Sequence, residues 1–167
     1  MKKIYSLMIC LVGTLLLSSC LSLAPTTITR HASLDGYKYF YVTPTSERSS
    51  VVGGTYGHGG YVYGSTNSSS ISPSDLISGY MMNRGYVRVP EVKPQDAAQT
   101  LIINYGDGNA RVGFWEERAI QVTIQILNGE TNALICVCSA EEKAGYEARA
   151  ITLAINKCLD EIFLQRP

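Results

Sequence analysis

The strongest constraint on the fold is a stretch near the C-terminus in which apolar and polar side chains alternate. Residues 119–127 carry a branched apolar side chain at every second position, with Gln or Thr between them. The apolar members are Ile120, Val122, Ile124 and Ile126. Because successive side chains of a strand point to opposite faces, the pattern predicts a strand with one buried and one wet face. Asn128-Gly129 follows at once and indicates a hairpin, whose loop can extend to Thr131.

The rest of the C-terminal part predicts a second strand and a helix that covers the pair. Residues 132–140 are apolar on both faces, and Cys136 and Cys138 share one of them. Residues 145–164 have apolar side chains three and four positions apart, which is the spacing of one helix face. The members of that stripe are Ile151, Ala154, Ile155, Cys158, Leu159 and Ile162. Cys158 is therefore expected on the side that faces the core.

Upstream, a second helix and several short strands are expected. Ser72-Pro73 suits a helix start, because serine caps and proline fits the first turn, and Gly85 suits its end. Strands are expected at 37–43, 86–89 and 101–105, and either a strand or an irregular crossing at 111–117. Late strands that follow one another pair as antiparallel neighbours. We therefore predict an α+β fold, a two-layer sandwich of a mainly antiparallel sheet with both helices on one face.

The N-terminus has the layout of a signal peptide. Lys2 and Lys3 precede a mostly apolar run from Ile4 to Leu17, which is too short for a typical spanning helix. Leu17-Ser18-Ser19-Cys20 then resembles the bacterial lipobox. That resemblance implies cleavage before Cys20 and attachment of diacylglycerol and a further acyl chain such as palmitate to this cysteine. Leu21, in place of aspartate, points to the outer membrane and a periplasm-facing position.

The predicted organisation follows from this signal. Residues 1–19 form the signal peptide, residues 20–36 a flexible tether, and residues 37–167 a single domain. Within the domain, residues 45–71 are dense in glycine, tyrosine and serine, which favours a flexible loop, with a short hairpin around Gly59-Gly60 as one option. Lys2 and Lys3 leave with the signal, so the mature part has slightly more acidic than basic residues. It has no basic run, and we expect no nucleic-acid partner.

The mature chain keeps Cys136, Cys138 and Cys158 besides Cys20. An oxidising envelope permits a disulfide. A disulfide between Cys158 and either Cys136 or Cys138 is one interpretation, and three buried thiols are the other. The cysteines lack a fourth ligand nearby in sequence, so no metal and no cofactor are expected.

The sequence has no hydrolase motif, and neither His31 nor His58 is expected on a rigid element. No catalytic residue is predicted, and we expect a non-enzymatic protein. Contact with a partner is assigned to aromatic side chains of the loop and of the 111–117 region. These are Tyr56, Tyr61, Tyr63 and Trp115.

The whole layout is similar to a family of uncharacterised bacterial lipoproteins with a domain of unknown function, found in Bacteroides-type gut bacteria. The similarity covers residues 37–44, 72–88, 100–106 and the strand at 120–126 with its closing helix. It implies fold and location. The expected function is a lipid-anchored binding or scaffolding module that contacts the membrane through its lipid and an envelope protein or glycan. The alternatives are an envelope hydrolase and a protein that binds a small molecule or glycan.

Overall fold

The computed structural model describes residues 22–45, 48–52, 56–58, 61–63, 67–108, 110–112 and 118–164. For the strands between residues 48 and 71, and for Val112, it describes the backbone alone. The predicted signal peptide and Cys20 lie outside the described residues.

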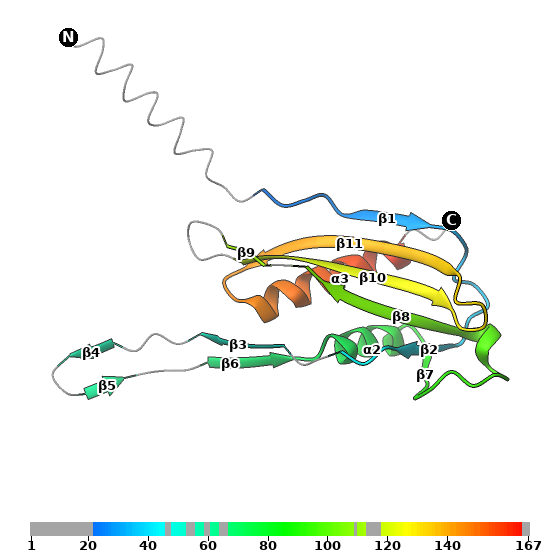
Figure 1. Ribbon diagram of the computed structural model, residues 1–167, viewed down its shortest axis with the longest axis horizontal. Helices are drawn as coiled ribbons and strands as arrows, with labels where there is room; N and C mark the ends of the chain where they lie inside the picture. The colour runs from blue at the N-terminus through cyan, green and yellow to red at the C-terminus, as the bar shows by residue number, and fades with distance from the viewer. Residues whose placement is uncertain are drawn as a thin grey trace, which may run out of the picture.

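The main body is a sheet of seven strands with two α-helices on one face (Figure 1). The strand order is β1-β11-β10-β8-β2-β7, and β9 pairs with β10. The strands are β1 Thr27–Arg30, β2 Tyr39–Val42, β7 Val87–Arg88, β8 Thr100–Asp107, β9 Arg111–Val112, β10 Arg118–Asn128 and β11 Leu134–Ala144. The helices among the described residues are α2, Pro73–Asn83, and α3, Glu147–Leu164, with a short 3₁₀ turn, η1, at Ala97–Gln99.

The pairing of the strands is mainly antiparallel, as predicted. β2 runs parallel to both β7 and β8, and the remaining neighbours run antiparallel. The predicted α+β class, with both helices on one side of the sheet, is confirmed.

The β10–β11 hairpin forms the centre of the sheet. The alternation in β10 places four apolar side chains against the helices, each no more than 1% exposed: Ile120, Val122, Ile124 and Ile126. The connecting loop runs through Ala133, whose carbonyl oxygen accepts from the Asn128 N–H at 2.9 Å. Gly129 is needed there for a close approach. A Cβ at this position would lie 2.7 Å from the Thr100 carbonyl oxygen and 2.8 Å from that of Ala97.

Both helices form where the sequence predicts them. The Ser72 side chain caps α2 by accepting from the Asp75 N–H, and the chain leaves the helix through Gly85 at a φ of +88°. α3 begins at Glu147 and buries every member of its predicted stripe, including Cys158. α3 lies over β10 and β11, while α2 packs beside α3 near β2 and β7.

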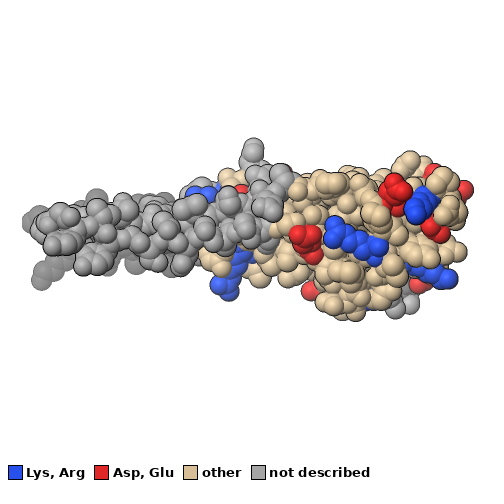
Figure 2. Space-filling model, turned by 90° about the horizontal axis from the view of Figure 1, so that it is seen from below, with Lys and Arg blue, Asp and Glu red and all other residues tan. Residues whose placement is uncertain are grey.

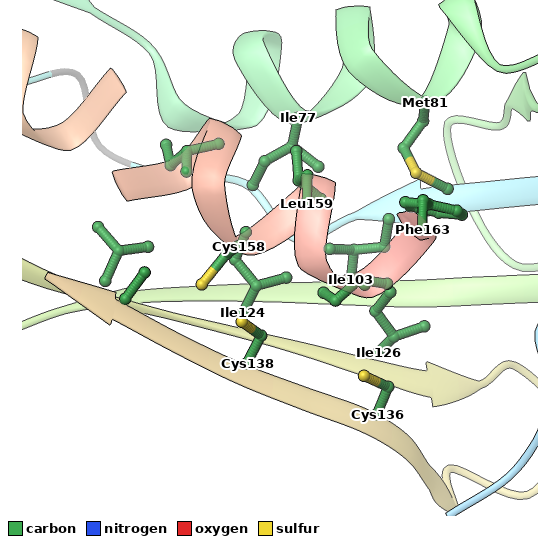
Figure 3. Packing of buried hydrophobic residues seen from close by; sticks show 14 of the residues in the cluster. Ile77, Met81, Ile103, Ile124, Ile126, Cys136, Cys138, Cys158, Leu159 and Phe163 are labelled. Carbon is green, nitrogen blue, oxygen red and sulfur yellow. The ribbon is translucent and has the colours of Figure 1, made fainter. Parts of the chain in front are cut away.

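The core lies between α3 and the central strands. Figure 3 shows Cys158 of α3 on the side of the sheet residues Ile124 and Cys138, while Leu159 lies toward Ile77 of α2. Met81 of α2 belongs to the same buried cluster. Each of these side chains is fully buried. At about 1.5–3 kcal/mol for each buried aliphatic side chain, this cluster dominates the stability of the fold.

The prediction that residues 20–36 form a flexible tether is wrong for the part that the structure describes. Thr27–Arg30 forms β1, which pairs antiparallel with β11, and the pair Ile28↔Cys138 fixes its register. Leu34, just after β1, is buried in the core. The physical reason is that β11 would otherwise be an unpaired edge, and a run of β-branched residues such as Thr27-Ile28-Thr29 suits the covering strand.

Residues 45–71 also hold more structure than the flexible loop that their composition predicts. β3, Arg48–Val52, pairs antiparallel with β6, Asn67–Ile71. Nearer the tip, β4, Tyr56–His58, pairs with β5, Tyr61–Tyr63, so the hairpin around Gly59-Gly60 is present. The valine and tyrosine residues between the glycines favour extended pairing, and the glycine and serine content concealed that signal.

Candidate functional site

The first described residues of the chain are held on the sheet by a buried carboxylate. Glu141 on β11 is only 4% exposed, and its Oε2 accepts from the Ala24 N–H at 2.6 Å. Arg111 on β9 donates from Nε to Glu141 at 2.8 Å and from Nη2 to the Ser22 carbonyl oxygen at 3.1 Å. We call these four residues, Ser22, Ala24, Arg111 and Glu141, the N-terminal clamp. The clamp fixes the chain from Ser22 onward.

The electrostatics of the clamp keep Glu141 ionised. The hydrogen bond from Arg111 lowers the pKa of Glu141 below its ordinary value, and the Ala24 N–H lowers it further, while burial acts in the opposite direction. The same hydrogen bond raises the pKa of Arg111. A buried carboxylate is tolerated when it is paired and hydrogen-bonded, and Glu141 meets both conditions.

At the opposite end of β1, a cleft opens beside the sheet. It has a volume of about 440 Å³, and its walls are residues 34–39 and 84–87. The walls present the rings of Tyr37, Tyr39 and Tyr86 together with the charged side chains of Lys38 and Asp35. Gly36 and Gly85 shape these walls with φ values of +86° and +88°, a region that favours glycine. Polar and aromatic groups in one hollow can contact a peptide or a glycan.

Arg84 at the edge of the cleft is held in place by aromatic and acidic neighbours. Its guanidinium lies 4.7 Å from the ring centroid of Tyr80 and 4.9 Å from that of Phe163. It donates to the Tyr80 hydroxyl at 2.5 Å, and that hydroxyl donates to Asp160 at 2.7 Å. Burial, followed by the hydrogen bond to Asp160, raises the pKa of Tyr80. The cation is therefore presented in a fixed position.

β9 and the start of α3, beside the clamp, lie at one end of the sheet, and the segment between β1 and β2, which lines the cleft, lies at the other (Figure 1). β1 begins beyond Ala24 and ends at Arg30, whose guanidinium donates to the Ile162 carbonyl oxygen near the end of α3. The start of α3 lies at the clamp end, where Glu147 pairs with Arg118 at 3.4 Å. With 18 residues at about 1.5 Å each, α3 separates the two ends by roughly 25 Å.

The three core cysteines are free thiols in this structure, so the expected disulfide is not formed in it. Cys138 and Cys158 instead share a hydrogen bond, and Figure 3 shows the Cys158 side chain directed toward Cys138. That hydrogen bond, with burial, raises the pKa of Cys158, and burial raises the pKa of Cys136. The same hydrogen bond lowers the pKa of Cys138. Buried thiols with a raised pKa, as at Cys136 and Cys158, are poor nucleophiles. The disulfide stays a prediction, and the contact favours Cys138 over Cys136 as the partner of Cys158.

The predicted contact residues are brought together only in part. The β4–β5 register places Tyr56 opposite Tyr63 and Tyr61 opposite His58. Trp115 and the lipidation residue Cys20 lie outside the described residues, so their roles stay predictions.

The clamp residues carried no recognisable sequence signal. Glu141 and Arg111 are 30 positions apart, and each belongs to a short run of mixed polar character. Over the described part of the chain, no three His, Cys, Asp or Glu side chains are placed to hold a metal ion. Within the same residues, no helix has the length and apolar content to cross a membrane.

Charged side chains on the visible face are mixed in sign. Figure 2 shows Lys and Arg beside Asp and Glu over the described part of this face, without a large area of one sign. Several charged side chains of the described residues form ion pairs, including Arg88 with Asp75 at 3.7 Å and Lys157 with Glu142 at 2.5 Å.

No protein-family description matches the chain, and no curated protein matches it. Among solved structures, the chain is similar to the PelC dodecamer from Paraburkholderia phytofirmans. A single-residue variant of PelC in space group C2 is 14% identical, covers 85% of this chain and 100% of its own, and gives a TM-score of 0.48. PelC in space group P6 is 14% identical over 81% of this chain and 96% of its own, with a TM-score of 0.48. At this distance the likeness carries no functional information.

Proposed function

We propose that this chain is a lipid-anchored lipoprotein of a bacterial cell envelope, a non-enzymatic binding or scaffolding module that faces the periplasm at the outer membrane. The observation that carries the proposal is the N-terminal sequence, in which Leu17-Ser18-Ser19-Cys20 closes an apolar run that begins after two lysines. Several acyl chains on Cys20 give stable anchoring, because each buried methylene contributes about 0.8 kcal/mol.

The hydrogen bonds of Ser22 and Ala24, which lie just after the lipobox, support this proposal. Ser22 and Ala24 follow the proposed cleavage site closely and are held by Arg111 and Glu141, so a chain that begins at Cys20 keeps the whole clamp. The cleft at the other end supports the binding role, since it exposes tyrosine rings and charged groups to an envelope protein or a glycan.

Fractionation of cells that express Cys20→Ala tests the anchor. Cys10→Ala is the matched control, since Cys10 lies within the predicted signal and should leave with it. We expect the Cys20→Ala protein to lose its association with membranes and the Cys10→Ala protein to keep it. Membrane association of both variants, with acyl chains still attached, would contradict the proposal.

A photo-crosslinking amino acid tests the binding role. Placed at Lys38, in the wall of the cleft, it should trap a discrete adduct in living cells. The matched position is Leu153, an exposed residue of α3 outside the cleft lining, where no such adduct is expected. Equal labelling at both positions would remove the support for a binding cleft.

A further inference from the structure

The N-terminal clamp limits how far the folded domain can move from a lipid attached to Cys20. Only Leu21 separates Cys20 from Ser22, whose carbonyl oxygen is held by Arg111. Since adjacent Cα atoms are about 3.8 Å apart, the Cα atoms of Cys20 and Ser22 lie within about 7 Å of each other. The distance between the clamp and the lipid is therefore set by two residues of chain, where a tether of residues 20–36 would have allowed a far wider range.

The direction of the chain then selects which part of the domain is nearest the lipid. β1 runs antiparallel to β11, with Thr27 opposite Ser139. Followed backwards from Thr27, the chain passes Glu141, to which Ala24 is bonded, and continues toward the end of β11 at Ala144. Figure 1 shows this end of the sheet together with β9, the start of β10 and the first turn of α3. Gly145, which is exposed, lies just beyond it.

Three ion pairs lie among the described residues near this end. Arg111 pairs with Glu141 at 2.5 Å, Arg118 with Glu147 at 3.4 Å, and Lys157 with Glu142 at 2.5 Å. A surface of paired charges can approach a lipid headgroup layer that is zwitterionic or mildly anionic without strong repulsion. Its orientation then depends on the short connection to the lipid, and salt should change it little.

We propose that the clamp end of the domain, formed by β9, the start of β10 and the end of β11, faces the membrane surface together with the β4–β5 hairpin, which extends past the same end (Figure 1), and that the cleft lies about 25 Å from the clamp end and opens to the periplasm. The inference rests on the proposed lipid at Cys20 and adds the partner of this surface, a phospholipid headgroup layer. The inference about orientation depends on the clamped segment directly after the anchor, because a free tether would let any face of the domain approach the bilayer.

Depth-dependent fluorescence quenching tests the orientation. The lipidated full-length protein would be reconstituted into vesicles of phosphatidylethanolamine and phosphatidylglycerol that contain a nitroxide on the headgroup. A fluorescent amino acid is introduced by codon suppression, which spares the native cysteines. The first position is Gly145, where an added Cβ meets no atom within 4 Å. The second is Glu130, an exposed residue in the hairpin loop at the opposite end.

Flotation of the protein with the vesicles is measured first and reports the anchor, and fluorescence quenching is measured second and reports the orientation. We expect quenching at Gly145 to be several-fold stronger than at Glu130, and to persist at raised salt. Protein that floats but is quenched equally at both positions, at neither, or more at Glu130 would overturn the orientation while leaving the anchor intact. Protein that does not float would overturn the proposed anchor, and the orientation with it.

An insertion variant separates the clamp from the lipid without altering the fold. About ten Gly and Ser residues placed between Leu21 and Ser22 add a flexible span of roughly 17 Å. This variant should still float and keep the melting temperature of the parent, but the difference in quenching between Gly145 and Glu130 should largely disappear. If the difference were unchanged, the surface itself would bind lipid and the short connection would not determine the orientation.

Discussion

Glu141→Gln should loosen the N-terminal segment while leaving the rest of the sheet in place. The carboxylate accepts from Arg111 and from the Ala24 N–H at 2.6 Å, and it is 4% exposed. A neutral amide retains the shape but has one acceptor in place of two, so one donor loses its partner. A hydrogen bond to a charged group contributes about 1.5–3 kcal/mol. Arg111 is 50% exposed and regains water, so we expect a loss of about 1.5 kcal/mol.

Glu142→Gln is the matched control, because it changes the neighbouring carboxylate by the same atoms. Glu142 pairs with Lys157, whose side chain is 40% exposed, and such pairs contribute about 0–1 kcal/mol. For a chain of this size, the Glu141→Gln protein should melt about 4 °C below the parent, and Glu142→Gln within about 2 °C of it. Hydrogen exchange should show lost protection at Ala24 and along β1 in Glu141→Gln alone. Unchanged protection at Ala24 would refute the clamp.

The effect of pH follows from the lowered pKa of Glu141. A carboxylate whose pKa is lower in the folded state contributes its full stability above the pKa of the unfolded chain, about 4.3 for glutamate. That contribution is lost as the pH falls through the lower, folded value. The difference in melting temperature between the parent and Glu141→Gln should therefore be constant near neutral pH and shrink below about pH 4. A difference that grew on acidification would contradict the assignment.

Three further substitutions test the packing of the core and the turns. Gly129→Ala places a Cβ 2.7 Å from the Thr100 carbonyl oxygen and should lower the free energy of unfolding by about 1–3 kcal/mol. Gly79→Ala, in open space on α2, should raise the free energy of unfolding by about 0.5–1 kcal/mol. Denaturant titration checks both values, and equal effects of the two substitutions would contradict the geometry. Ile155→Ala, at a fully buried position of α3, should lower the same quantity by about 2–5 kcal/mol, and a loss under about 1 kcal/mol would mean that α3 does not cover the sheet as described. If a disulfide forms in the envelope, mass analysis of non-reduced peptides should show Cys158 linked to Cys138. The Cys136→Ala protein should retain this link and the Cys138→Ala protein should lose it. Three thiols that can be alkylated in the parent protein would exclude the disulfide.

The elements that could be predicted from the sequence are those with a regular local pattern. The strand has its alternation within residues Ile120 to Ile126, and the helix has its apolar stripe within residues Ile151 to Ile162. The position and the buried face of each element could therefore be predicted from its own segment. The strand and helix patterns also predicted that Cys138 lies on an apolar strand face and Cys158 on the core-facing side of the helix, and in the structure the two thiols share a hydrogen bond. The turn at Asn128-Gly129 was found, although the reason for the glycine, its contact with the carbonyl oxygens of Ala97 and Thr100, depends on distant residues.

The parts that the sequence concealed depend on contacts between distant positions. β1 has no apolar period, because an edge strand with Thr27 and Thr29 exposed resembles a polar connection. Its placement depends on Glu141, which is 117 positions from Ala24, and on Arg111, neither of which is marked by a motif. The β3–β6 pairing was hidden for a related reason, since a ribbon rich in serine and glycine has the composition of a flexible loop.

The mass of the N-terminal peptide of the mature protein, taken from purified membranes, tests the central claim most directly. We predict a peptide that begins at Cys20 and carries a diacylglycerol on its sulfur and a further acyl chain on its amine. Alkaline hydrolysis should remove the two ester-linked chains and leave the amide-linked one. A mature chain that begins at another residue, or one that begins at Cys20 with a free thiol, would contradict both the anchor and the membrane-bound orientation that depends on it.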